Sequence, residues 1–427
     1  MESFIVPLSS PEATDADRFG PKAANQAALG QAGLPIPDGF CLDAAAYRLQ
    51  IASLDLGASA RGAFAAVDRM EARRHALRMR LELLEQPLVP AISEPLLSAW
   101  RALVASSGAP TVVRSSALVE DRDGASFAGQ FESYLGIEDE SEFLTAVRAC
   151  WAALWSTRAL RYMATHDLDP AETAMAVLVQ PLVAAKVAGG GLSRTATGEM
   201  LVTATWGLGS SIAQGEVTPD RFELSPDGEL LRVSAGQKDH RVGCVHRVPT
   251  TEAVPRGLAA EPCLDRSQIL EIARLLRRAE DAQEIPVEIE WALDDDGFKL
   301  LQARPLNLQP AHVPDEIWLQ HPRLSGHPAG VGWAAGRAVV INCECELGRV
   351  APGDVLVTRV AGPALAHLLS RVAGVVTERG GSTSHFASLA RERGIPMVLG
   401  VGDATRRIPD GAQVAVDGIA GIVRWMA

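Results

Sequence analysis

The spacing of apolar and polar residues along the chain predicts a mixture of helices and strands. Apolar residues at helical spacing predict helices over residues 61–85, 141–166 and 265–283, the last with Asp265 as its N-cap. Short apolar runs predict strands at 111–113, 175–180, 201–206 and 287–293. The mixture indicates an α/β or α+β fold.

The segment Thr377 to Gly400 places one histidine at the start of a predicted helix. Residues 372–377 read as a strand, and Ser384 and its neighbours are candidate N-caps of a helix ending near residue 393. His385 then lies in the first turn, where the helix dipole disfavours imidazolium and N–H groups are available to phosphate oxygens. A neutral imidazole can accept a phosphoryl group. A lone histidine in such a place is nevertheless more often an ordinary residue of a capped helix.

Two acidic residues alternate with apolar ones in the last of the predicted strands. The alternation places Glu288 and Glu290 on one face. If residues 295–297 form a three-residue hairpin loop, Glu290 faces Gln302 and Glu288 faces Arg304 across the strands. Oxygen ligands of this kind suit Mg²⁺, although a solvent-facing hairpin with salt bridges fits the same pattern.

Longer motifs around these residues resemble one known family. The pattern GG.TSH.A..AR..GIP.V.G, at 380–400, resembles the phosphohistidine swivelling domain of the PEP-utilising dikinases, which include pyruvate phosphate dikinase, PEP synthase and rifampicin phosphotransferase. The string RSSALVEDRDGASFAGQ, beginning at Arg114, resembles the signature of their ATP-grasp domain, and VEIEWA with LQARP resembles the block that closes it. The resemblance implies an ATP-grasp domain followed by a small β/β/α swivelling domain.

The resemblance also assigns roles to individual residues. It makes His385 the phosphorylated histidine, and it makes Glu290 and Gln302 ligands of Mg²⁺, with Glu288 as a further candidate ligand. It assigns ATP binding to Lys22, Arg114, Gly129, Ser133, Gln180, Glu290, Gln302 and Arg304. Pro21 replaces a usual glycine beside Lys22, which should stiffen that turn.

The segment 307–325 carries three prolines and little periodicity, which predicts the main linker. We expect an ATP-grasp domain at 1–306, with subdomains of about 1–185 and 186–306, and a swivelling domain at 326–427. The linker is long enough to let the second domain move between sites.

The resemblance implies an ATP-dependent phosphotransferase of the dikinase type. His385 would take the β-phosphoryl group of ATP, with release of AMP and phosphate, and pass it to an acceptor. No motif identifies that acceptor, for which a small molecule is expected. Two alternatives stay open: a phosphohistidine carrier subunit whose acceptor site lies on another chain, and a degenerate regulatory or structural relative.

Composition narrows the class of protein and its partners. A chain of 427 residues with 47% hydrophobic content predicts a globular protein of two or three domains, and a formal charge of −12 argues against nucleic acid as a partner. The sequence has no apolar run of membrane-spanning length, and its start is too acidic for a secretory signal, so we expect a cytoplasmic protein without a membrane partner. Six scattered cysteines are expected to be free thiols, because the Cys343-Glu344-Cys345 pair lacks a second pair at zinc-binding distance.

Overall fold

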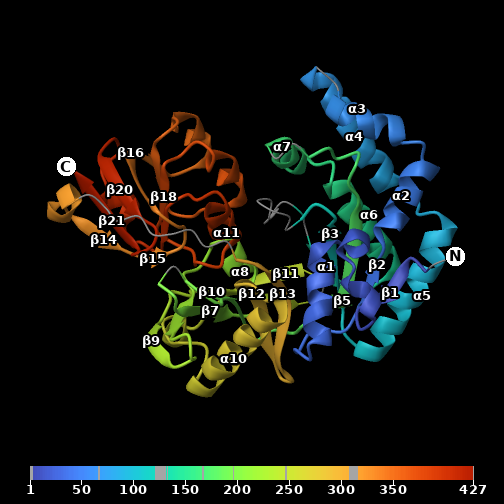
Figure 1. The fold of residues 1–427 in the computed structure, drawn as a ribbon, viewed down its shortest axis with the longest axis horizontal. Helices are drawn as coiled ribbons and strands as arrows, with labels where there is room; N and C mark the ends of the chain where they lie inside the picture. The colour runs from blue at the N-terminus through green and yellow to red at the C-terminus, as the bar shows by residue number, and fades with distance from the viewer. Residues whose placement is uncertain are drawn as a thin grey trace. The chain divides into compact units, whose positions relative to one another are not determined.

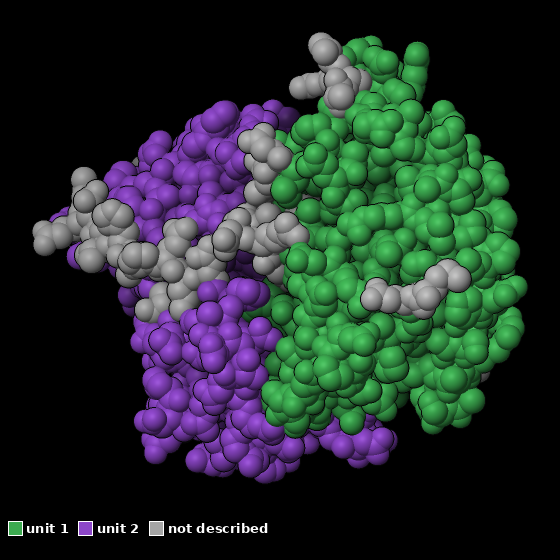
Figure 2. Space-filling view, turned by 45° about the vertical axis from the view of Figure 1, so that its right-hand side comes forward, with its two compact units in different colours: residues 1–184, 244–249, 299–304 green, residues 185–243, 250–298, 305–427 purple. Residues whose placement is uncertain are grey.

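The computed structural model describes residues 3–65, 68–120, 131, 133–165, 168–195, 197–245, 248–306 and 316–426. The chain divides into two compact units, which Figure 2 colours green and purple. Unit 1 comprises residues 1–184, 244–249 and 299–304, and unit 2 comprises residues 185–243, 250–298 and 305–427. Figure 1 labels the helices and strands.

Unit 1 contains a five-stranded antiparallel sheet of order β1-β2-β5-β3-β4. Its strands are β1 (Ile5–Pro7), β2 (Phe40–Leu42), β3 (Thr111–Ala117), β4 (Ser133–Ile137) and β5 (Met175–Pro181). Its helices are η1 (Pro11–Thr14), α1 (Ala16–Gln31), α2 (Ala44–Ser53), α3 (Gly57–Ala65), α4 (Arg69–Glu85), α5 (Pro90–Ser107), α6 (Glu140–Ala153) and α7 (Thr157–Thr165). Helices α1 and α6 both pack on β3 and β5, so the central strands of the sheet are buried.

Two of the three predicted helices are each divided in the structure. The stretch 61–85 contains the end of α3 and the whole of α4, because the side chain of Asp68 accepts a hydrogen bond from the Met70 amide and N-caps a new helix. The stretch 141–166 is divided between α6 and α7, where Ser156 Oγ accepts from the Ala159 amide. In both stretches, a side-chain cap starts a new helix where the spacing of apolar residues alone predicts one continuous helix.

The first part of unit 2 is an antiparallel sheet whose strands follow the order β12-β6-β7-β8-β9. Its strands are β6 (Val187–Leu192), β7 (Met200–Trp206), β8 (Asp220–Leu224), β9 (Leu230–Ser234) and β12 (Val287–Asp294). The helices of this part are α8 (Ser210–Ala213), α9 (Arg256–Ala259) and α10 (Arg266–Gln283). Strands β10 (His240–Val245) and β11 (Val248–Ala253) form a separate two-stranded sheet that is divided between the units. Helix α10 packs on β7 and β12 (Figure 1), and Asp265 forms the expected N-cap, within a capping box with Gln268.

Strand β13 (Gly297–Pro305) follows β12, and residues 299–304 of β13 belong to unit 1. The strand bounds leave Asp295 and Asp296 between the two strands, so the expected three-residue loop is one residue shorter. Gly297 was expected to be the last residue of the loop, but it is the first residue of β13, with a positive φ of 109°. Beyond the hairpin, the Leu306 amide donates to the Pro286 carbonyl over 2.8 Å.

The second part of unit 2 is an eight-stranded mixed sheet of order β14-β21-β20-β16-β17-β18-β19-β15. Its strands are β14 (Arg323–Ser325), β15 (His327–Pro328), β16 (Trp333–Ile341), β17 (Val355–Thr358), β18 (Gly374–Thr377), β19 (Met397–Leu399), β20 (Gln413–Asp417) and β21 (Ile422–Met426). Its helices are η2 (Glu316–Gln320), η3 (Glu344–Arg349), η4 (Pro363–Leu368), α11 (His385–Glu392) and α12 (Ala404–Arg407). The predicted linker thus includes η2 and β14, while residues 307–315 lie outside the described part of the chain.

The four central strands β16 to β19 are parallel, and their valines form the core of this sheet. Parallel strands buried on both faces have near-continuous apolar sequences, as Val355–Thr358 and Gly374–Thr377 do. Their carboxyl ends meet at one edge, and β18 leads from this edge into the turn before α11.

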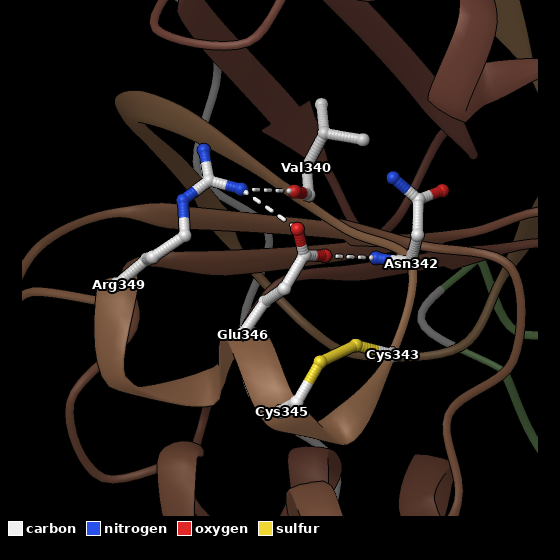
Figure 3. Close-up of a disulfide and its surroundings, with 6 residues drawn as sticks. All are labelled: Val340, Asn342, Cys343, Cys345, Glu346 and Arg349. Carbon is white, nitrogen blue, oxygen red and sulfur yellow. Dashed lines mark hydrogen bonds and ion pairs between the residues drawn. A yellow bond between two sulfur atoms is a disulfide. The ribbon is translucent and has the colours of Figure 1, made fainter.

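One expectation about the cysteines is wrong. Cys343 and Cys345 form a disulfide in the turn that enters η3, with their Cα atoms 5.3 Å apart (Figure 3). Cys41, Cys150 and Cys263 are free and buried, as expected. Around the disulfide, Glu346 accepts a hydrogen bond from the Asn342 amide and lies beside Arg349 (Figure 3). Sequence spacing alone could not distinguish a disulfide from two thiols, because either fits two cysteines separated by one residue.

Within the described residues no single helix has the length and hydropathy of a membrane span. The helical segments Met70–Glu85 and Pro90–Ser107 have the required length and hydropathy only when they are taken together, and the pair is bent by 57°.

Candidate active site

Lys22 is positioned by a kink in α1. Gly20 has φ 74° and ψ 155°, and the helix resumes at Pro21, whose fixed φ suits a first helical position. A Cβ atom at Gly20 would lie 2.5 Å from Ser116 Oγ, so only glycine fits this approach to β3. The kink turns the Lys22 ammonium toward β3, where it donates to the Ser115 carbonyl over 2.7 Å.

Glu120 is the second partner of Lys22, at 3.1 Å, and sequence reasoning did not single it out. Its side chain is buried and also accepts from the Ala117 amide. The glutamate belongs to the quoted RSSALVE string, which is the only signal that could have found it. The carboxylate holds the ammonium where a phosphate oxygen could compete for it.

Arg114 lies on β3 and joins two predicted site residues within unit 1. Its Nη2 donates to Gln302 Oε1 over 2.8 Å, its Nη1 donates to the Leu301 carbonyl, and Ser133 is its cross-strand partner on β4. Lys22 thus contacts the residue of β3 that directly follows Arg114. Unit 1 therefore gathers Lys22, Arg114, Ser133 and Gln302, a set that offers two cations to a phosphate chain.

The other unit 1 candidates lie on the same sheet and on β13. Gln180 is paired with Val112 of β3, is buried, and donates through its side chain to the Pro37 carbonyl over 2.9 Å. Arg304 is buried near the end of β13. Gly129 lies outside the described residues.

His385 is the first residue of α11 in unit 2. Ser384 is the N-cap of this helix, because its Oγ accepts a hydrogen bond from the Ala387 amide over 3.2 Å. Phe386, Ala387, Leu389 and Ala390 are buried and α11 packs on η4, while His385 is only partly buried. The predicted helix start is confirmed, and it leaves the imidazole beside the first-turn N–H groups.

Glu288 has a set of partners that no sequence pattern indicated. Both carboxylate oxygens accept from Ser388 Oγ, at 3.0 and 2.8 Å, and one accepts from Arg391 Nη2 at 2.9 Å. The three residues are 4–6% exposed. All three belong to unit 2, with Glu288 on β12 and its partners on α11.

The donor chemistry of Glu290 and Gln302 fits a hard cation such as Mg²⁺, because both offer oxygen atoms. Glu290 is half-buried on β12, and Gln302 Oε1 keeps a second lone pair beside its bond from Arg114. Across the described ranges, no three His, Cys, Asp or Glu side chains gather closely enough to hold a metal ion by themselves. A bound ion would therefore need further oxygen ligands, such as the phosphates of a nucleotide, to complete its coordination.

Comparison with known families accounts for most of the chain. Residues 16–320 match the family described as pyruvate phosphate dikinase, AMP/ATP-binding domain, and residues 350–421 match the PEP-utilising enzyme, mobile domain. The chain belongs to the pyruvate phosphate dikinase family. The expected mixed α/β fold, an ATP-grasp-like ATP-binding domain followed by a mobile domain, is confirmed for this dikinase-family chain.

Individual relatives agree with this assignment. The phosphoenolpyruvate synthase of Aeropyrum pernix is 33% identical, over 95% of this chain and 56% of that protein. The probable phosphoenolpyruvate synthase of Methanothermobacter thermautotrophicus is 32% identical, over 95% of this chain and 61% of that protein. Among solved structures, the D-alanine-D-alanine ligase of Coxiella burnetii is 12% identical with a TM-score of 0.26, over 68% of this chain and 48% of that one. The dikinase-family chain thus spans less than two thirds of the length of these synthases.

In this dikinase-family chain the candidate residues are divided between two bodies. The cations Lys22, Arg114 and Arg304 belong to unit 1, whereas Glu290 and His385 belong to unit 2. Such a division suits a reaction in which one body holds the nucleotide and the other carries the transferred group.

Proposed function

We propose that the chain is an ATP-dependent dikinase-type phosphotransferase whose His385 carries the phosphoryl group. The observation that supports this most directly is the place of His385 at the first position of α11, inside the matched mobile domain. A phosphoryl group on this imidazole would lie at the N-terminal end of α11, where the helix dipole stabilises its negative charge.

In the proposed first step, Lys22, Arg114 and Arg304 hold the phosphates of ATP. An imidazole nitrogen of His385 attacks the β-phosphorus, a P–N bond forms, and the bond from that phosphorus to the α,β-bridging oxygen breaks. AMP leaves with the electron pair. Glu290 and Gln302 would hold Mg²⁺, which supplies neutralisation of phosphate charge.

The bound diphosphoryl group then loses its γ-phosphate by transfer to water, which releases inorganic phosphate. The remaining phosphoryl group passes from His385 to the oxygen of an acceptor, and the imidazole is regenerated. The balance is ATP, water and acceptor giving AMP, phosphate and phosphorylated acceptor. Carrying the group on a mobile domain separates a water-excluding nucleotide site from the acceptor site.

We further propose that the acceptor is a small molecule bound outside the two matched regions. Those regions cover residues 16–320 and 350–421, so within these 427 residues only short stretches are left for an acceptor-binding body. A second candidate function is that of a phosphohistidine carrier whose acceptor site lies on another chain.

Labelled ATP tests the proposal. The protein is incubated with ATP carrying ³²P in either the β or the γ position, and acid-labile phosphate is mapped by mass spectrometry. We expect retained β-label on His385, AMP formation, and loss of both in His385→Asn. The matched control is His367→Asn, at an exposed histidine of η4. ADP as the sole nucleotide product, or unchanged labelling of His385→Asn, would contradict the proposal.

A metabolite screen with the charged protein separates the two candidates. Decay of the label in the presence of a small molecule supports direct transfer. A label that is stable until a second protein is added supports the carrier role.

A further inference from the structure

The contact between β12 and α11 is an ion pair with a hydroxyl between its partners. Arg391 donates through Nη2 to Glu288 and to Ser388 Oγ, and Ser388 Oγ also lies within hydrogen-bond distance of both Glu288 oxygens. The salt bridge measures 2.9 Å, with 6% and 4% of the two side chains exposed. A carboxylate and a guanidinium removed from water in this way depend on one another, because either alone would be a buried charge without compensation.

Arg391 is held mainly by its own domain. Its Nη1 donates to the carbonyls of Ala329, which precedes β16, and of Ser382, which lies between β18 and α11. Of its described partners, Glu288 alone comes from outside residues 316–426. Loss of the Glu288 carboxylate would therefore weaken the attachment of the mobile domain to β12 while leaving the internal contacts of that domain in place.

Two further contacts strengthen the same attachment. Thr203 Oγ1 of β7 and Thr383 Oγ1 lie 2.7 Å apart and are buried, and Pro219 approaches Gly381 so closely that a Cβ atom there would lie 2.5 Å from it. Along the sequence, Gly381 and Thr383 precede His385 and Ser388 follows it. The attachments thus flank the histidine on both sides, and the position of the imidazole depends on all of them.

We propose that Glu288 is a positioning residue that fixes α11, and with it His385, for phosphoryl transfer, and that it is not a ligand of the metal. This inference rests on the proposed function, because its effect on the rate of His385 labelling presupposes phosphoryl transfer to His385. Both oxygens of the carboxylate accept hydrogen bonds from Ser388, and one also accepts from Arg391, so this carboxylate is committed to α11 rather than to a metal ion. Each movement of the mobile domain to an acceptor would break the Glu288–Arg391 pair, so the strength of this pair sets how often α11 leaves β12.

Kinetics of Glu288→Gln separate the two roles. We expect labelling of His385 in a single turnover to slow by about 10- to 100-fold, with ATP affinity and the half-saturating Mg²⁺ concentration unchanged. Ser388→Ala should slow labelling in the same way, and the double variant should lose less than the sum of the single losses, because the residues act together. Glu290→Gln serves as the comparison, since removal of a metal ligand raises the Mg²⁺ requirement. A Mg²⁺ requirement raised in Glu288→Gln as in Glu290→Gln would overturn the proposal.

Amide hydrogen exchange tests the attachment independently of activity. We expect faster exchange in residues 385–392 of Glu288→Gln than of the unmodified chain. The control is Glu252→Gln, whose carboxylate forms an exposed pair with Arg241. Equal exchange in Glu288→Gln and Glu252→Gln would overturn the proposal. If the unmodified chain takes no label on His385, the proposed function fails, while the exchange measurement still decides whether Glu288 holds α11.

Discussion

Arg114 Nη2 donates to Gln302 Oε1 over 2.8 Å and so joins two residues that lie 188 positions apart in the sequence. A second guanidinium nitrogen donates to the carbonyl of Leu301, so the fork of Arg114 spans two consecutive residues of β13. The planar guanidinium is thereby fixed in one orientation, which lysine cannot reproduce because its ammonium is a single point charge. This orientation is what the first prediction tests.

Arg114→Lys should weaken ATP binding about 10- to 100-fold, the usual loss when a charged hydrogen-bonding group is misplaced. Titration calorimetry with a non-hydrolysable ATP analogue measures the change. The matched control is Arg101→Lys, at an exposed arginine that pairs with Glu140 over 2.7 Å. Equal affinity of Arg114→Lys and the unmodified chain would show that Arg114 only supports β13.

Sequence reasoning predicted the parts of this fold that depend on local pattern. The strands at Thr111, Met175 and Val287, the capped helix α10 and the N-cap of α11 follow from periodicity and capping residues. Motifs also predicted His385 at the start of a helix. These features are local because hydrogen bonds within a few residues of one another determine them.

The partners of the site residues could not be predicted in the same way. Lys22 and Glu120 are 98 positions apart, and Glu288 and Arg391 are 103 positions apart, so only the tertiary fold brings them together. The alternation in β12 places Glu288 on one face of the strand, but nothing in a single strand reveals what covers that face. The helix that covers it begins almost one hundred residues later.

Gly190→Ala should impair labelling of His385. Gly190 lies on β6, and a Cβ atom there would lie 2.6 Å from Cβ of Thr383, closer than carbon atoms approach without displacement. We expect single-turnover labelling to slow by at least about 10-fold, with ATP affinity retained. Gly257→Ala is the control, because a Cβ atom at Gly257 meets nothing within 4 Å. Normal labelling in Gly190→Ala would mean that the loop before α11 tolerates displacement.

Asp220→Asn should destabilise unit 2. Asp220 is fully buried and accepts from the Gly236 and Cys263 amides, from Cys263 Sγ and from the fully buried ammonium of Lys238. Loss of the carboxylate leaves that ammonium without compensation, at a cost of about 3–5 kcal/mol. Urea denaturation measures the difference.

The exposed pair of Lys186 with Asp295 provides the matched control for this variant. Asp295→Asn should leave the free energy of unfolding nearly unchanged, because solvent screens exposed charges. Similar losses in the two variants would contradict a special role for the buried pair.

Reduction should change one peptide, which contains the start of η3. A disulfide between Cys343 and Cys345 gives the peptide that contains both residues a mass lower by two hydrogens, and dithiothreitol should restore the mass. Mass spectrometry after alkylation without reductant checks this, and Cys343→Ser should show one alkylated thiol at Cys345. Alkylation of both cysteines in the untreated, freshly purified protein would contradict the disulfide.

His327→Gln should make the protein less sensitive to acid. Burial first, and then the charge of Arg221, lower the pKa of His327 from its ordinary value of 6.5 to about 4, while Glu223 raises it and Arg232 lowers it further. The folded state therefore keeps the imidazole neutral below pH 6.5, where the unfolded state binds a proton. Protonation of His327 in the unfolded state therefore does not reduce the free energy of unfolding above pH 6.5. It reduces this free energy progressively as the pH falls from 6.5 toward 4. At pH 5 the loss amounts to about 2 kcal/mol.

Urea denaturation at pH 7.5 and pH 5.0 measures this loss in the unmodified chain and in His327→Gln. The free energy of unfolding of the variant should fall by about 2 kcal/mol less between the two pH values. Glutamine does not titrate, and the two proteins share every other titrating group. His367→Gln, at an exposed histidine, should lose as much as the unmodified chain. An equal loss in all three proteins would mean that the buried imidazole finds a proton acceptor on acidification, and that Glu223 rather than Arg221 dominates its surroundings.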